Sequence, residues 1–288
     1  MNRLATFRSM IPAALCGTLA LAASAPARAD FDPQIGQPGS KGIAATSPLF
    51  QGWATSVAGF ERGPQNAANP AGPLANVGTP ENALGDPSSG LVSLGDGGSI
   101  TLGFDAPIAD GAGADFAVFE NGFLASAGSF LAYLELAFVE VSTDGVNFFR
   151  FAATSLTQTS TQVGGFGMLD ARDLDNLAGK YVAGYGTGFD LAELAGVSPL
   201  LDVRNVNFVR IVDVVGSIDP AYGSYDSLGN LVNDPYATPF GSSGFDLTGV
   251  GVINFAPAPA AVPEPSSLAL AGIGLLVTAA LRACRRAA

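Results

Sequence analysis

Short runs of apolar residues, separated by Gly, Pro, Asn and Asp, recur along residues 30–255. Runs of this length between turn-forming residues are typical of antiparallel β-strands. The runs at 91–94, 99–104 and 115–119, each next to a glycine-rich turn, predict three strands of a meander. Because the pattern continues without an internal linker, it predicts one all-β sandwich domain over residues 30–255.

The clearest hairpin is predicted over residues 137–151. Two apolar runs, 137–142 and 146–151, lie on either side of Asp144 and Gly145. An Asp-Gly pair favours a tight turn because glycine, and to a lesser degree Asp, tolerates positive φ.

Two more strands are predicted near the end of the domain. Residues 208–214 carry alternating side chains, as in a half-buried strand, and residues 249–255 close the domain. In the hairpin, Glu140 alternates with Val139 and Val141, so we expect Glu140 to face solvent.

Two segments lack this alternation. Residues 32–80 are rich in Pro, Gly and Asn, and we expect them to wrap the sandwich with few regular strands, with Trp53 as a core or covering aromatic. Residues 216–244 form a longer structureless stretch than the roughly 15 residues usual inside a compact domain, and such stretches are usually functional or disordered.

The segment 216–244 combines aromatic rings with hydrogen-bond acceptors. Sugar sites commonly pair an aromatic face with Asp and Asn side chains that accept from hydroxyl groups. The segment therefore predicts a ligand-binding site for carbohydrate, or alternatively an ordered loop whose tyrosines cover one end of the sandwich. The candidate ligand-binding residues are Tyr222, Tyr225, Asp226, Asn233, Asp234 and Tyr236.

The N-terminus has the three parts of a secretory signal. Arg3 and Arg8 form a basic region, residues 10–25 are apolar, and Ala27-Arg28-Ala29 is a small-x-small cleavage site. These features predict a signal peptide over 1–29 and an exported chain.

The C-terminus has an equally ordered pattern. A Pro- and Ala-rich linker over 256–265 ends in Pro263-Glu264-Pro265 and is followed by an apolar run at 268–281 and a cluster of arginines. A run this short spans a bilayer only marginally, because about 20 apolar residues are needed. We predict that residues 266–288 are a C-terminal sorting and transmembrane segment.

This three-part order resembles the PEP-CTERM sorting signal of exported bacterial proteins. The resemblance implies transient anchoring in the inner membrane, cleavage near Pro263-Glu264-Pro265 by an exosortase-type enzyme, and delivery to the cell surface or an exopolysaccharide matrix. An ordinary tail anchor is the alternative.

The charge of the part between the two signals limits its partners. Six of the 13 Lys and Arg residues and one of the 25 Asp and Glu residues lie in the terminal segments, so the remainder carries 7 − 24 = −17 charges. Such a surface repels nucleic acid and attracts divalent cations. The chain has no histidine, which excludes histidine-based triads and zinc sites, and both cysteines lie in the terminal segments.

Three motifs in the domain resemble a known fold family. Residues 139–148, 207–212 and 83–89 are similar, in this order, to the hairpin, Val-Arg-Ile strand and loop of galactose-binding-like, discoidin-type jelly rolls. The resemblance implies two packed antiparallel sheets and, commonly, a carbohydrate-binding or adhesive module.

A second resemblance concerns residues 115–121 and 244–247, which are similar to paired motifs of a set of bacterial surface proteins. That set continues with an acidic residue, where this chain has Thr248. Gly-Phe-Asp-Leu occurs twice, and we expect Phe189 and Phe245 to fill the core while Asp190 caps a turn.

Oxygen-bearing side chains next to Gly and Pro suggest a structural calcium ion, since calcium takes six to eight oxygen ligands. The candidate metal ligands are Asn82 and Asp86 in one loop and Asp246 before the closing strand. Ordinary capping of turns is the alternative.

The sequence favours a binding protein over an enzyme. Glu120, Glu135 and Glu140 are the carboxylates considered for glycoside hydrolysis, which needs two at a defined separation. We assign no catalytic residue and expect a non-catalytic, carbohydrate-binding surface or matrix protein. A purely structural or adhesive protein and a polysaccharide hydrolase are the alternatives.

Overall fold

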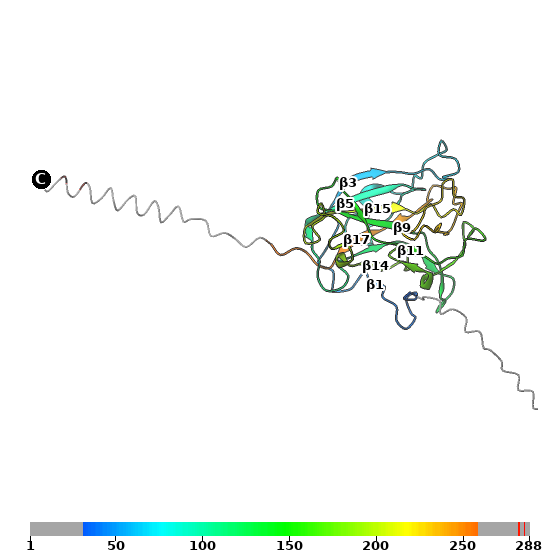
Figure 1. Cartoon of the computed structure of the whole chain (residues 1–288), viewed down its shortest axis with the longest axis horizontal. Coiled ribbons are helices and arrows are strands. Elements are labelled where there is room, and N and C mark those ends of the chain that lie inside the picture. The colour runs from blue at the N-terminus through cyan, green and yellow to red at the C-terminus, as the bar shows by residue number, and fades with distance from the viewer. Residues whose placement is uncertain (1–30, 259–281, 283–284, 286–288) are drawn as a thin grey trace, which may run out of the picture. The chain divides into compact units, whose positions relative to one another are not determined.

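The computed structural model describes residues 31–258 together with Arg282 and Arg285 (Figure 1). The predicted signal peptide at 1–29 and the apolar run at 268–281 lie outside the described residues. Within the described part, no helix combines the length and the apolar character that crossing a membrane requires.

Residues 31–258 form antiparallel sheets, which confirms the prediction of an all-β domain. The discoidin-type jelly roll stays a prediction. The first five-stranded sheet has the order β1 (Ile43–Ala44), β14 (Tyr185–Phe189), β6 (Phe116–Phe119), β17 (Gly249–Val252), β2 (Gly52–Trp53). The second has the order β10 (Phe149–Arg150), β9 (Ala137–Ser142), β15 (Val206–Asp213), β5 (Ser99–Ile108), β3 (Ser56–Glu61) (Figure 1).

The main hydrophobic core lies between these two sheets. Phe116 and Val250 of the first sheet and Leu102 and Ile211 of the second belong to one buried cluster. Phe189 stacks on Phe116 with ring centroids 5.4 Å apart. Burial of apolar surface from both sheets stabilises the domain by about 25 cal/mol for each Å² removed from water.

Smaller elements flank the two sheets. They are β4 (Val92–Ser93) paired with β16 (Asp246–Leu247), β11 (Thr154–Ser155) paired with β13 (Leu174–Asp175), and a sheet of β7 (Phe123–Leu124), β8 (Leu131–Tyr133) and β12 (Leu169–Asp170). Three short 3-10 helices complete the described part: η1 (Pro80–Ala83), η2 (Ala171–Asp173) and η3 (Leu191–Leu194).

Each predicted strand corresponds to an observed one, but the predicted meander was wrong, because β4, β5 and β6 lie in three different sheets. The alternation at 208–214 corresponds to β15, in which Val209 and Ile211 are buried and Arg210 is half-buried. At the predicted hairpin turn, Gly145 has φ of 75°, and the carboxylate of Asp144 accepts hydrogen bonds from the backbone N–H groups of Val146 and Asn147.

The expectation for Glu140 was wrong. Its side chain is buried beneath two arginines rather than exposed. Arg150 lies opposite Glu140 on β10 and Arg210 lies opposite it on β15, and both guanidinium groups form ion pairs with its carboxylate. The strand order, which the sequence pattern does not contain, brings these three charges together.

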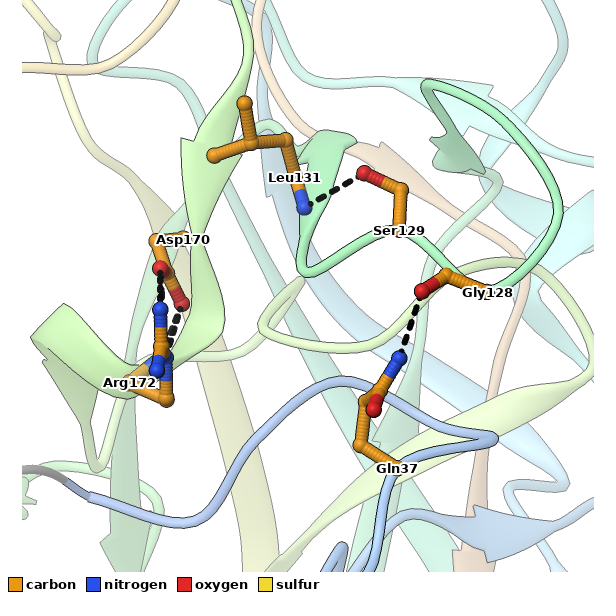
Figure 2. Close-up of polar contacts among 6 residues, drawn as sticks. All are labelled: Gln37, Gly128, Ser129, Leu131, Asp170 and Arg172. Atoms are coloured by element: carbon orange, nitrogen blue, oxygen red, sulfur yellow. Dashed lines mark hydrogen bonds and ion pairs between the residues drawn. The ribbon is translucent and has the colours of Figure 1, made fainter.

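The turn of the β7–β8 hairpin contacts the segment around Gln37, and its strand β8 pairs with β12, which carries an ion pair (Figure 2). Gln37 donates a 2.6 Å hydrogen bond to the carbonyl of Gly128, and Arg172 forms a 2.6 Å ion pair with Asp170 of β12. The guanidinium of Arg172 also lies 4.3 Å from the ring centroid of Phe130. These contacts fix a hairpin that carries two aromatic side chains of the site described below.

Candidate functional site

A surface cavity of about 210 Å³ combines aromatic walls with acidic groups. We call it the aromatic cavity. Its lining residues are Asn121, Phe123, Tyr133, Glu135, Phe166, Phe240, Ser242 and Asp246.

Four rings form a continuous row along the aromatic cavity. Phe123 stacks on Tyr133 with centroids 5.1 Å apart, and Phe166 stacks on Phe240 at 5.9 Å. Tyr133 and Phe166 join the two pairs at 6.4 Å. Phe166 is 75% exposed and Phe123 is 54% exposed, so two of the rings present large apolar faces to solvent.

Local structure explains the position of each ring. Phe123 of β7 and Tyr133 of β8 are directly opposite each other in the antiparallel register, which places both side chains on the same face of the hairpin. Phe166 and Phe240 come from two long connections. The backbone N–H of Tyr236 donates a 3.1 Å hydrogen bond to the carbonyl of Val163, which ties these connections together.

Two buried carboxylates line the same cavity. Glu135 accepts a 3.1 Å hydrogen bond from the hydroxyl of Tyr133. Asp246 accepts one from the amide of Asn121 at 3.0 Å and another from the hydroxyl of Ser93. Burial raises the pKa of Asp246 to about 6, and burial together with the charge of Glu120 raises the pKa of Glu135 well above its usual range.

A second cavity, of about 310 Å³, has charged walls instead of aromatic ones. Lys180 and Asp32, which both line it, form a 2.9 Å ion pair with each other. Oδ2 of Asp32 is nevertheless buried without a hydrogen-bond partner among the described residues, and the acidic side chains of Asp175, Asp190 and Glu193 also line this cavity.

The polar residues of the predicted sugar site at 216–244 bond to the backbone. Asp226 accepts from the N–H groups of Ser155 and Leu228, and Asp234 accepts from the N–H of Leu136. Asn233 is fully buried and donates to the carbonyls of two residues in the neighbouring connection. These three side chains hold the long segment in place.

The predicted tyrosines do not form one row. The ring centroids of Tyr222 and Tyr236 lie 5.9 Å apart. The hydroxyl of Tyr236 donates a 2.7 Å hydrogen bond to the side-chain oxygen of Asn66. Tyr225 is 47% exposed and lies in an isolated bridge with Leu231. A sugar platform at Tyr222, Tyr225 and Tyr236 stays a prediction.

The predicted metal ligands have separate hydrogen-bond partners. Asn82 accepts a 2.7 Å hydrogen bond from the N–H of Thr79, and exposed Asp86 accepts one of 2.9 Å from the N–H of Ser88. Asp246 is bonded to Ser93 and Asn121, as described above. Calcium binding by Asn82, Asp86 and Asp246 stays a prediction.

A group of three carboxylates lies in the first sheet where β6 begins and β14 ends. Oxygens of Asp110, Asp115 and Asp190 lie within 4.8 Å of one another. Asp115 accepts backbone hydrogen bonds from Gly111 and Leu191, and Asp190 caps η3, as predicted, by accepting from Ala192. Their hydrogen bonds organise this end of the sheet.

The aromatic cavity itself was missed at the sequence level. Phe123, Phe166 and Phe240 lie in segments with no shared motif, and the sequence signal they share is only an aromatic residue directly next to glycine.

Comparison with known proteins adds one finding. The PEP-CTERM protein-sorting motif matches residues 261–286, which confirms the predicted sorting segment. This motif implies an exported protein that is transiently anchored in the membrane and processed by an exosortase. No curated protein matches the chain. The chain therefore carries a PEP-CTERM motif for exosortase sorting at its C-terminus.

Proposed function

We propose that this exported protein is a non-catalytic carbohydrate-binding protein of the cell surface or exopolysaccharide matrix, and that the aromatic cavity is its sugar site. The observation that carries the proposal is the row of four aromatic rings next to buried oxygen acceptors. The resemblance of residues 139–148 and 207–212 to discoidin-type jelly rolls supports it.

The chemistry of the cavity suits a sugar ring. Exposed Phe166 and Phe123 offer apolar faces for the C–H groups of a pyranose. Asn121, Ser242 and the carboxylate of Asp246 offer hydrogen-bonding atoms for hydroxyl groups. The cavity is smaller than the 300–1,000 Å³ or so of pockets for drug-sized ligands, so it fits one sugar unit of a longer chain.

Buried carboxylates that accept from sugar hydroxyls add specificity, because a missing hydroxyl would leave them unpaired. The aromatic faces add affinity because their apolar surface is removed from water when the sugar packs against them. This division of roles requires no chemical step.

Affinity electrophoresis in gels that contain exopolysaccharide from the host tests the proposal. We expect the wild type to be retarded, and Phe166→Ala to lose most of the retardation without a loss of stability, because Phe166 is mostly exposed. Tyr225→Ala is the matched control, an exposed aromatic of the loop predicted from sequence. Retardation that is lost in Tyr225→Ala and kept in Phe166→Ala would reject the aromatic cavity as the sugar site.

A second candidate function is glycoside hydrolysis. It is favoured by the carboxylates of Glu135 and Asp246, which line one cavity, because that reaction uses two carboxylates on either side of the scissile bond. Release of new reducing ends from the polysaccharide, lost in Glu135→Gln, would support this candidate. Retardation without any release supports binding alone.

A further inference from the structure

Glu120, which directly follows β6, has a buried carboxylate oxygen with no partner. Its side chain is 1% exposed. Oε2 accepts a 2.6 Å hydrogen bond from the N–H of Gly122, whereas Oε1 has no hydrogen-bond partner among the described residues. Leaving such an oxygen desolvated and unpaired is costly, so it marks a place where a partner is missing.

A cationic side chain does not supply this partner. Among the residues that the structure describes, no arginine or lysine forms an ion pair with Glu120. The partner that fits is a ligand that accepts electron pairs from oxygen.

More oxygen atoms surround the same position. Glu120 lines a largely apolar cavity of about 510 Å³ together with Asn121 and Thr248. The hydroxyl of Thr248 is also buried without a hydrogen-bond partner among the residues described. The N–H of Thr248 bonds to the carbonyl of Phe119, so the end of the β6–β17 ladder places Thr248 opposite Glu120.

Asp246 supplies a second carboxylate. It lies two residues before Thr248, and its carboxylate accepts a 3.0 Å hydrogen bond from the side-chain amide of Asn121, the residue that follows Glu120. Asn121 lines both this cavity and the aromatic cavity. Two carboxylates, an amide and a hydroxyl thus gather at the boundary between the two cavities.

We propose that Glu120 and Asp246 bind one divalent cation, with Asn121 and Thr248 as further oxygen ligands. Calcium is the ion that this chemistry favours, because the donors are all hard oxygens. The chain has no histidine, and residues 30–255 contain no cysteine. Water completes a coordination shell of six to eight oxygens. Thr248 contributes a neutral hydroxyl oxygen, so the four protein ligands carry two negative charges in total.

This site differs from the ligand set expected from the sequence. It shares Asp246 with that set but replaces the loop residues Asn82 and Asp86 by Glu120, Asn121 and Thr248. The pairing of β6 with β17 places Thr248 opposite Glu120. The inference does not depend on carbohydrate binding, since cation binding is measured without sugar.

Calorimetric titration of the chelator-treated full chain with calcium chloride tests the site. We expect one ion per chain, with a dissociation constant in the range of extracellular modules, about 10⁻⁴–10⁻³ M. Glu120→Gln keeps the shape of the side chain and removes its charge, and we expect it to weaken binding about tenfold or more. Thr248→Val should weaken binding by a smaller factor.

Two controls make the outcome decisive. Asp190→Asn removes a carboxylate of the other acidic group and should leave the affinity for calcium unchanged. Thermal melting with chelator present shows whether each variant folds, and Thr248→Val replaces Glu120→Gln if the latter does not. A wild type that binds no calcium, wild-type affinity in Glu120→Gln, or loss of the ion in Asp190→Asn would overturn the proposal.

Discussion

The hydroxyl of Tyr133 donates a 3.1 Å hydrogen bond to the carboxylate of Glu135, two residues further along the chain. The ring of Tyr133 stacks on Phe123 in the wall of the aromatic cavity, and Glu135 lines the same cavity. One hydrogen bond therefore links the aromatic wall to a buried acid.

Tyr133→Phe should destabilise the domain while keeping the aromatic wall. The variant removes the donor to Glu135 and leaves a buried acceptor unpaired, which costs about 1–3 kcal/mol. Urea unfolding measures the change in the free energy of unfolding. Tyr225→Phe, in an exposed loop, is the control and should change it by less than about 0.5 kcal/mol. Equal stability of Tyr133→Phe and wild type would show that the bond contributes nothing.

Glu140→Gln should also lower stability. The carboxylate of Glu140 is buried between Arg150 and Arg210, and its neutral replacement leaves both guanidinium groups without a counter-charge. Both arginines are about one third exposed or more, so water compensates in part, and we expect a loss of about 1–3 kcal/mol.

Urea unfolding checks this prediction with Glu61→Gln as the matched control, since Glu61 is an exposed acid on the edge strand β3. A loss of the same size in both variants would mean that net charge, rather than the ion pairs, is responsible.

The buried acids Asp213 and Asp234 should make the domain more stable at low pH. Burial is the largest cause that raises the pKa of each carboxyl well above its usual value. The folded state therefore keeps these protons to a higher pH than the unfolded chain, whose Asp pKa is about 3.9. The resulting stabilisation is complete below the unfolded pKa and is lost as the pH rises through the folded pKa.

Thermal melting in chelator between pH 4 and pH 8 measures this slope. We expect the melting temperature to fall as the pH rises, with a shallower slope in Asp213→Asn and an unchanged slope in Asp105→Asn, an exposed acid. A melting temperature that rises steadily with pH would contradict the assignment.

The strand pattern was predictable where the alternation is regular, as at 208–214. Strand β3 was not expected, because a register shift between Val57 and Gly59 interrupts the two-residue period that marks a strand. The burial of Glu140 was not predictable either, since it depends on which strands lie on each side of β9.

The aromatic cavity was beyond sequence reasoning for a similar reason. Tyr133 and Phe123 could have been paired only with the register of β7 and β8 in hand. Phe166 and Phe240 meet because hydrogen bonds join two long connections, and neither connection has a regular period. The PEP-CTERM segment was predictable because its three parts are contiguous in the chain.

Processing at the C-terminus should remove the arginine cluster. The PEP-CTERM motif implies cleavage by an exosortase, which the sequence places near Pro263-Glu264-Pro265. Mass spectrometry of the surface fraction from a host with the matching enzyme should therefore find no peptide that contains Arg285. Recovery of intact Arg285 there would show that the tail is kept as an anchor.

The most direct test of the sugar site is the proton spectrum of the aromatic rings during titration with oligosaccharides cut from the host exopolysaccharide. We predict that the ring resonances of Phe166 and Phe240 shift with increasing sugar and reach saturation, because a sugar would pack against these rings. Unchanged Phe166 and Phe240 resonances, with saturating shifts at Tyr222 and Tyr225 instead, would contradict the account.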